Sequence, residues 1–283
     1  MERDILAQGY RIVARGKREL SKDELRHYEV VISLAGNIFS SAIDKLKKKL
    51  ERGSAVKNTL REFIGIRTQK ESGVKLSDVI PDLQDKISSI LEEFKLRERG
   101  GADENQMVRV THQDRQRNAS EDAFTFIQCD LDERNRKEGK IGLNRKRNKK
   151  RVHLNDRFFS QSPLESALTL AHEISHYKLR TDDHFYYSFL IFDDDNPSAE
   201  EKINRFFERH RLIAKSSDVN ELKSLLLGWP EDWASKEVRI KGAKMIENLF
   251  NASGRGNVLS RVKHLTSNAD TIALLAFRLG ANK

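Results

Sequence analysis

Five consecutive residues, His172-Glu173-Ile174-Ser175-His176, carry the clearest chemical signal in this chain. The apolar run 167–171 precedes them and is typical of a helix. Positions four apart share one face of a helix, so both imidazoles can reach one metal ion while Glu173 lies beside them. Catalytic zinc sites keep one position open for water, and a neighbouring carboxylate can take the proton of that water. The pattern therefore predicts a zinc-dependent hydrolase, most often a peptidase.

The residues before the motif favour a helix that would present both histidines together. Pro163 suits the first turn of a helix, and either Ser160 or Ser162 can cap it. Apolar and small residues then follow at helical spacing: Leu164, Leu168, Ala171 and Ser175. We expect an amphipathic helix whose histidines face a cleft beside the core. Because a pattern with so few fixed positions also arises by chance, the rest of the site decides between catalysis and coincidence.

A catalytic zinc site needs a third protein ligand besides the two histidines. The polar turn that follows the helix offers Asp182, Asp183 and His184. Glu200 and Glu201 are rivals, because a gluzincin would supply its glutamate from such a helix further along the chain. Acidic residues are nevertheless common at any helix N-terminus. The residue types alone leave these candidates open.

The motif and the turn together resemble the aspzincins, the deuterolysin and peptidyl-Lys metalloendopeptidase family. The pattern of that family is H-E-x-x-H followed by G-T-x-D-x-x-Y, and this chain reads Arg180-Thr181-Asp182-Asp183-His184-Phe185-Tyr186 in the second place. Arg180 thus stands where the family has a glycine, a residue that often marks a backbone with positive φ. The matching aspartate is Asp183, and the matching tyrosine is Tyr186.

The resemblance implies a role for each residue of the site. The implied cofactor is Zn²⁺, bound by His172, His176 and Asp183. Glu173 would deprotonate the zinc-bound water and pass the proton to the leaving amine. Tyr186 would donate a hydrogen bond to the oxyanion of the intermediate. The implied activity is that of a zinc metalloendopeptidase acting on a protein or peptide substrate.

Further segments extend the resemblance over residues 105–190 and 265–280. Residues 151–159 resemble the family's edge strand and the turn after it, and residues 268–277 resemble its closing helix. Asp270 in that helix either orients a zinc ligand by a hydrogen bond or serves as a structural cap. The implied fold is α+β, mainly helical and zincin-like, with a small antiparallel sheet beside the zinc helix. Strand 152–154 would be its edge, where a peptide substrate can add as a further strand.

The predicted organisation is a single zincin-like catalytic domain over residues 1–283. It consists of an N-terminal helical part (1–105), the sheet, zinc helix and ligand turn (106–192), a helical insertion (193–262) and a closing helix (263–283). Apolar periodicity predicts helices at 31–50, 60–66 and 83–96, and three more in the insertion at 198–214, 219–227 and 230–250. Short alternating runs predict strands at 108–111, 124–127, 141–143 and 152–154.

The composition bounds the setting of the protein. Of its 283 residues, 37% are hydrophobic and 34% are charged, and no apolar run approaches the ~20 residues that span a membrane. Cys129 is the single cysteine, which favours a reducing compartment. The start, Met1-Glu2-Arg3-Asp4, lacks the apolar core of a secretory signal. We expect a cytoplasmic protein, or one secreted without a cleaved Sec signal as an effector or toxin.

The net charge of +9 is concentrated in one stretch. Between Arg134 and Arg151 lie ten Lys or Arg residues and one Glu. This stretch is predicted to be a β-hairpin with a basic turn at 145–150, and such a block of like charges is usually a solvated tip. A non-catalytic, zinc-containing nucleic-acid-binding protein is the alternative that this hairpin suggests, although nucleic acid is the less favoured partner.

Overall fold

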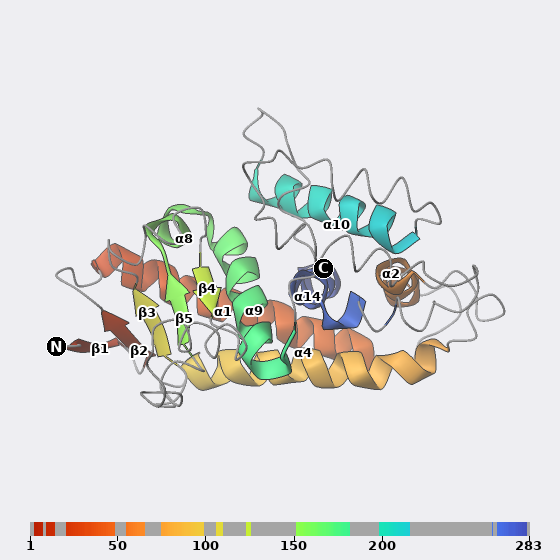
Figure 1. The fold of residues 1–283 in the computed structure, drawn as a ribbon, viewed down its shortest axis with the longest axis horizontal. Helices are drawn as coiled ribbons and strands as arrows, with labels where there is room; N and C mark the ends of the chain where they lie inside the picture. Colours follow the sequence, from red (N-terminus) through yellow and green to blue (C-terminus); the bar gives the residue numbers. More distant parts are fainter. Residues whose placement is uncertain are drawn as a thin grey trace, which may run out of the picture. The chain divides into compact units, whose positions relative to one another are not determined.

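The computed structural model describes residues 3–7, 10–14, 21–48, 55–65, 75–98, 106–109, 123–125, 151–181, 198–215, 262 and 265–281. The chain separates into two compact units. The first unit combines residues 1–37 with 89–180, and the second combines residues 38–88 with 181–283. Figure 1 labels two long helices, α1 (Lys22–Lys47) and α4 (Leu76–Glu98). Each of them contributes residues to both units.

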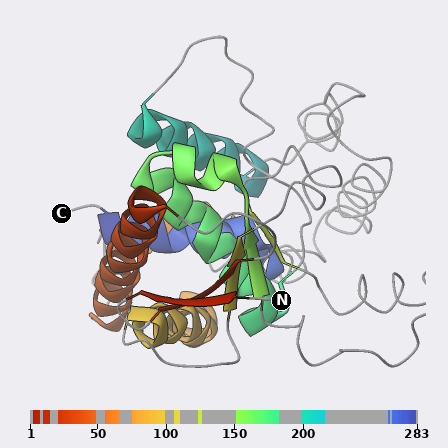
Figure 2. The same ribbon diagram turned by 90° about the vertical axis from the view of Figure 1, so that its left-hand side faces the viewer.

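Five short strands of the first unit form one mixed sheet. Their order across the sheet is β1-β2-β3-β5-β4. The outer pairs β1–β2 and β5–β4 are antiparallel, whereas β3 runs parallel to both β2 and β5. Figure 2 shows β1 and β2 in red. The strands are β1 (Arg3–Ala7), β2 (Tyr10–Ala14), β3 (Gln106–Arg109), β4 (Ala123–Thr125) and β5 (Arg151–Leu154).

The predicted fold class, α+β and zincin-like with a small antiparallel sheet beside the motif helix, is wrong. The described residues are overwhelmingly helical and few of them lie in strands. Those strands also pair differently from the prediction, because β4 precedes β5 in the chain but lies outside it. β3 and β5 thereby become parallel neighbours. The edge strand predicted at 152–154 is wrong for the same reason, since β5 lies between β3 and β4.

The helical start predicted for the chain is also corrected by β1 and β2. Each of these strands has an apolar pair, Ile5-Leu6 and Ile12-Val13, which is too short to reveal a period. β1 pairs with β2, and β2 pairs on its other side with β3, which lies far along the chain. Pairing between such distant segments cannot be predicted from the residues next to each strand.

Helices α8 (Asp156–Ser160) and α9 (Pro163–Leu179) complete the first unit, together with the parts of α1 and α4 that belong to it. α9 packs against β4 and β5. Val152 and Leu154 of β5 are fully buried, as is Phe158 of α8. This packing gives the motif helix a rigid support.

The second unit is built from helices. α2 (Ala55–Ile64), α10 (Ala199–Lys215) and α14 (Ala269–Ala281) pack against one another. Aromatic side chains link them in edge-to-face pairs, Phe63 with Phe207 and Phe39 of α1 with Phe277. Gly280 lets the backbone of α14 lie close to the backbone of α1, because a Cβ at this position would be 2.0 Å from the carbonyl oxygen of Ile38.

The helices predicted by apolar periodicity within the described ranges are confirmed. The spans 31–50, 60–66, 83–96 and 198–214 correspond to α1, α2, α4 and α10, with ends that differ by several residues. The helices predicted at 219–227 and 230–250 and the strand at 141–143 lie outside the described residues. Among the described helices, none has both the length and the apolar character to cross a membrane.

Candidate metal centre

The motif helix α9 begins with a complete capping box. Ser162 Oγ accepts a hydrogen bond from the backbone N–H of Glu165 at 3.2 Å, and the Ser162 N–H donates to Glu165 Oε2 at 3.2 Å. Pro163 occupies the first helical position. Of the two predicted caps, Ser162 is therefore confirmed. The box satisfies two backbone donors and defines where the helix begins.

The central part of α9 is buried all around. Every residue from Leu170 to His176 is buried, so the expected amphipathic pattern does not hold over these two turns. The side chains of His172, Glu173 and His176 are included, at 7%, 6% and 4% exposure. Buried polar groups need partners. Three of them together inside a unit form a polar centre rather than part of a solvated face.

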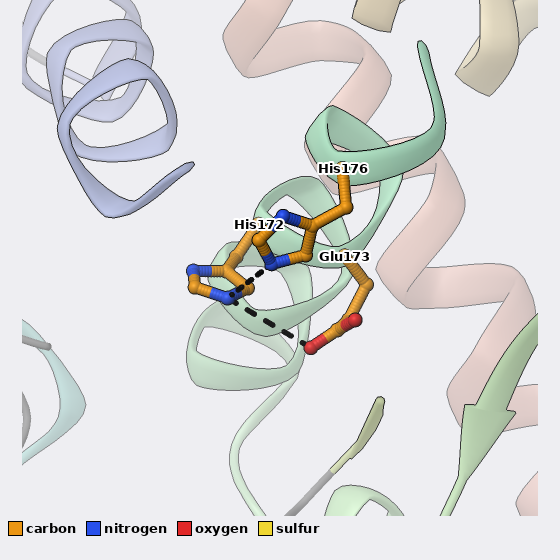
Figure 3. A group of neighbouring side chains, drawn as sticks. All are labelled: His172, Glu173 and His176. Carbon is orange, nitrogen blue, oxygen red and sulfur yellow. Dashed lines mark hydrogen bonds and ion pairs between the residues drawn. The ribbon is translucent and has the colours of Figure 1, made fainter. Parts of the chain in front are cut away.

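The two imidazoles of this centre meet through their Nε2 atoms (Figure 3). The distance from His172 Nε2 to His176 Nε2 is 3.1 Å, and the rings are nearly perpendicular at 87° with centroids 4.7 Å apart. Glu173 points to the same place, with its Oε1 3.9 Å from His172 Nε2. One nitrogen from each ring and one carboxylate oxygen thus converge on a small volume.

This geometry fits a zinc ion. Two nitrogens that each bind zinc at about 2.0–2.1 Å with tetrahedral angles lie about 3.3 Å apart, close to the 3.1 Å observed. Among the described residues, His172, Glu173 and His176 form the group of metal-binding types whose ligand atoms all lie within 4.8 Å of one another. Imidazole nitrogen is a preferred ligand of zinc. A hydrogen bond between two neutral imidazoles has the same length, and metal analysis separates the two cases.

α9 ends in a left-handed turn. Arg180 has φ 55° and ψ 41°, and its N–H donates to the carbonyl of His176 at 3.1 Å. Glycine is the usual residue in this conformation at the end of a helix, and here Arg180 adopts it. Thr181, the next residue, is buried at 1% exposure. The turn therefore directs the chain away from the helix directly after the second histidine.

The candidates for the third ligand lie largely outside the described residues. Asp182, Asp183 and His184 are the candidates that lie there. Tyr186, Cys129 and the basic turn 145–150, for which other roles were considered, also lie outside the described residues. Their predicted roles stay predictions.

The rival ligands Glu200 and Glu201 lie in the first turn of α10, in the second unit. Both are exposed, and Glu201 forms an ion pair with Arg205 at 2.8 Å. The backbone N–H of Glu201 donates to Ser198 Oγ at 3.2 Å. These are the ordinary features of a helix N-terminus. These contacts account for both glutamates without a metal ion.

Asp270 lies in the first turn of α14, also in the second unit. Asn268 begins this helix, with its carbonyl accepting from Ile272 N–H at 3.3 Å and its side chain donating to Thr271 Oγ1 at 3.2 Å. Asp270 also acts electrostatically on buried His210. The hydrogen bonds at this helix start belong to Asn268, and the two roles considered for Asp270 stay predictions.

Two contacts that hold α9 in place were not predicted from the sequence. His27 of α1 lies with its Nε2 3.0 Å from Ser166 Oγ, and that hydroxyl donates to the Phe158 carbonyl at 2.7 Å. Burial lowers the pKa of His27, more than its hydrogen bond to the backbone of Phe158 raises it. Glu93 of α4 lies 3.5 Å from Lys178 of α9. Both contacts join distant segments, so no local spacing signals them.

No protein-family model matches this chain, and comparisons with curated proteins and with solved structures find no match either.

Proposed function

We propose that this protein is a zinc metalloendopeptidase whose metal centre is built on His172 and His176. The observation that carries the proposal is the 3.1 Å separation of the two Nε2 atoms, with the Glu173 carboxylate directed to the same place. All three side chains are buried and come from two turns of one helix. A structural zinc site would be closed by four protein ligands and has no use for a carboxylate base.

The chain's own groups divide the work of peptide hydrolysis. A zinc ion in this centre supplies a Lewis acid that lowers the pKa of water. Glu173 accepts the proton of the attacking water on its carboxylate and delivers it to the nitrogen of the leaving amine. The protein around Glu173 excludes bulk solvent, which strengthens its electrostatic interactions. The capping box at Ser162 and the turn at Arg180 hold the two ends of the helix.

The remaining parts of the proposal rest on the aspzincin resemblance. Asp183 is the third ligand, and Tyr186 donates to the developing oxyanion. The substrate is a protein or peptide. A setting as an effector or toxin, or in the cytoplasm, belongs to the same proposal.

The decisive experiment compares the protein with its Glu173→Gln variant. Both proteins are purified without added zinc, analysed for metal and assayed by mapping new termini in a protein lysate. Wild type is expected to hold one zinc per chain and to generate new termini. The variant should keep the metal but lose turnover by several orders of magnitude, because an amide cannot accept the proton.

A His172→Ala, His176→Ala double variant is the control for the metal. It should bind no zinc, and stoichiometric zinc in this protein would place the ion elsewhere. Peptidase activity that survives Glu173→Gln would remove Glu173 as the base. A wild type without zinc under any loading condition would end the proposal altogether.

The third ligand is identified by the same metal analysis. Asp183→Ala should weaken zinc binding, whereas Tyr186→Phe should keep zinc and lower mainly kcat. Parallel Asp182→Ala and His184→Ala variants should retain zinc. If Glu200→Ala or Glu201→Ala loses the metal while Asp183→Ala keeps it, the gluzincin alternative replaces the aspzincin one.

A further inference from the structure

A buried carboxylate joins α4 to the last turn of α9 within the first unit. Glu93 is 0% exposed, and its two oxygens face different cations. Arg97 Nη2 lies 2.7 Å from Oε1, and Lys178 Nζ lies 3.5 Å from Oε2. Arg97 belongs to α4 like Glu93, whereas Lys178 belongs to α9. These three side chains are called the α4–α9 ion cluster below.

The cluster lies beside the most vulnerable part of the candidate metal centre. His176 is in the last turn of α9, two residues before Lys178, whereas His172 is one turn deeper in the helix. The last turn of a helix has unsatisfied carbonyls and tends to fray. Fraying here would change the distance between the two Nε2 atoms, on which metal binding depends.

The charges of the cluster oppose such fraying. A carboxylate removed from water is costly unless cations and hydrogen bonds compensate for it, and Arg97 supplies such a cation from within α4. The contact of Lys178 with Glu93 crosses from α9 to α4, so it holds the two helices together. Lys178 also lies at the negative end of the α9 dipole, where a positive charge is favourable. If the last turn of α9 unwound, Lys178 would lose both its contact with Glu93 and its place at the negative end of the helix dipole.

We propose that the α4–α9 ion cluster of Glu93, Arg97 and Lys178 positions His176 for metal binding by holding the last turn of α9 against α4. This inference rests on the proposed function, because it concerns the same metal centre. Lys178 and Glu93 are positioning residues that act through the helix and touch neither substrate nor metal. Changes to groups that orient a metal ligand typically cost about ten- to a hundredfold in metal affinity. Because Lys178 acts through backbone, the lower end of this range applies.

The test is Lys178→Met in the full-length protein. Met keeps much of the apolar stem but removes the charge, and Glu93 keeps its contact with Arg97. Zinc affinity is measured by competition with a chromophoric chelator, and the geometry of the site by the visible spectrum of the cobalt-substituted protein. The variant should bind zinc about tenfold more weakly and show altered cobalt bands. Lys178→Arg should restore both, because a guanidinium reaches the same carboxylate.

Lys86→Met is the matched control. Lys86 also belongs to α4, has a side chain 23% exposed compared with 29% for Lys178, and forms an ion pair with Asp82 at 2.7 Å. It lies in the second unit, so this variant should keep wild-type zinc affinity and cobalt spectrum.

The melting temperature of each metal-free protein separates positioning from general stability. A Lys178→Met protein that melts earlier yet has the wild-type zinc affinity and cobalt spectrum would overturn the inference and leave the proposed function intact. Equal weakening by Lys86→Met would overturn it as well. A wild type that binds neither zinc nor cobalt would overturn both proposals together.

Discussion

At the scale of single residues, Arg180 has an unusual backbone: among the residues that the structure describes, it is the non-glycine residue with a positive φ. Its φ of 55° lies in the left-handed region, where a side chain is crowded against its own backbone. Helices commonly use this conformation to end, and glycine adopts it without that cost. Arg180 therefore carries local strain directly after the turn that holds His176.

Arg180→Gly should stabilise the protein by about 1 kcal/mol, because relief of the left-handed strain exceeds the entropy that glycine loses on folding. The free energy of unfolding, measured by urea denaturation of the metal-free protein, tests this. Arg180→Ala is the control, since it removes the same side chain but keeps a Cβ and should give no such gain. If alanine stabilises the protein as much as glycine, the effect belongs to the lost charge and not to the backbone.

The reading of the sequence identified the local part of the site and missed the distant part. His172, Glu173 and His176 lie within two turns of one helix, so their spacing alone predicted that they meet. The cap at Ser162 was predictable for the same reason. Glu93 and His27 come to α9 from other helices, and a contact between distant segments depends on the packing of the whole unit.

At the scale of elements, the helices were predictable because each carries its own apolar period and its own end signals. The strands predicted at 108–111, 124–127 and 152–154 lie close to β3, β4 and β5. β1 and β2 were missed, because five residues show no reliable period, and the order of the strands was not predictable because most of their pairing is non-local. β4 illustrates this: its sequence suggested a strand, but its outer place in the sheet depends on β3 and β5 becoming neighbours. The prediction of an antiparallel sheet, which the family resemblance implied, was wrong because β3 and β5 are parallel neighbours.

The packing of α14 on α1 depends on a glycine, Gly280, at their contact. A Cβ at Gly280 would lie 2.0 Å from the carbonyl oxygen and 2.7 Å from the carbonyl carbon of Ile38. Backbone atoms of a buried helix cannot move aside as a flexible side chain can. Gly280→Ala should therefore destabilise the protein by about 1–3 kcal/mol, the usual cost of overpacking, as measured by urea denaturation.

Gly36 provides the opposite case on α1. A Cβ there would have its nearest contact at 4.0 Å, with Phe94 Cβ, which is ordinary van der Waals distance. Gly36→Ala should stabilise the protein by up to about 1 kcal/mol through the higher helix propensity of alanine. If both variants change stability in the same direction, the close contact at Gly280 does not control the packing.

At the scale of the whole molecule, the two units differ in the kind of polar group they bury. The first unit buries the candidate metal centre and the ion pair of Glu93 with Arg97, groups that need a metal ion or counter-charges. The second unit buries His210, which stacks on Phe63 at 4.3 Å and donates from Nε2 to the Phe63 carbonyl at 2.8 Å. This histidine is a satisfied core residue, so it contributes to stability through its protonation state and not through metal chemistry.

The stability of the protein should therefore fall as the pH is lowered from about 6.5 to about 4. Burial lowers the pKa of His210 from 6.5 to about 4, and the Phe63 carbonyl and Asp270 only partly oppose this. Between these two values the unfolded chain takes up a proton that the folded protein does not, so acid favours unfolding. The full effect is about 3 kcal/mol, complete near pH 4, where the folded protein also takes up the proton.

Urea denaturation of the metal-free protein from pH 7.5 to 4 measures this loss, and His210→Gln isolates it. Glutamine can donate to the same carbonyl but does not titrate, so its stability should depend less on pH by about the same 3 kcal/mol. Both proteins are stripped of metal first, which excludes proton-driven release of an ion from the proposed site at His172 and His176 as a second cause. If the free energy of unfolding depends on pH in the same way for both proteins, the pKa of His210 is not lowered by burial. The core of the second unit would then be more accessible to water than its buried side chains indicate.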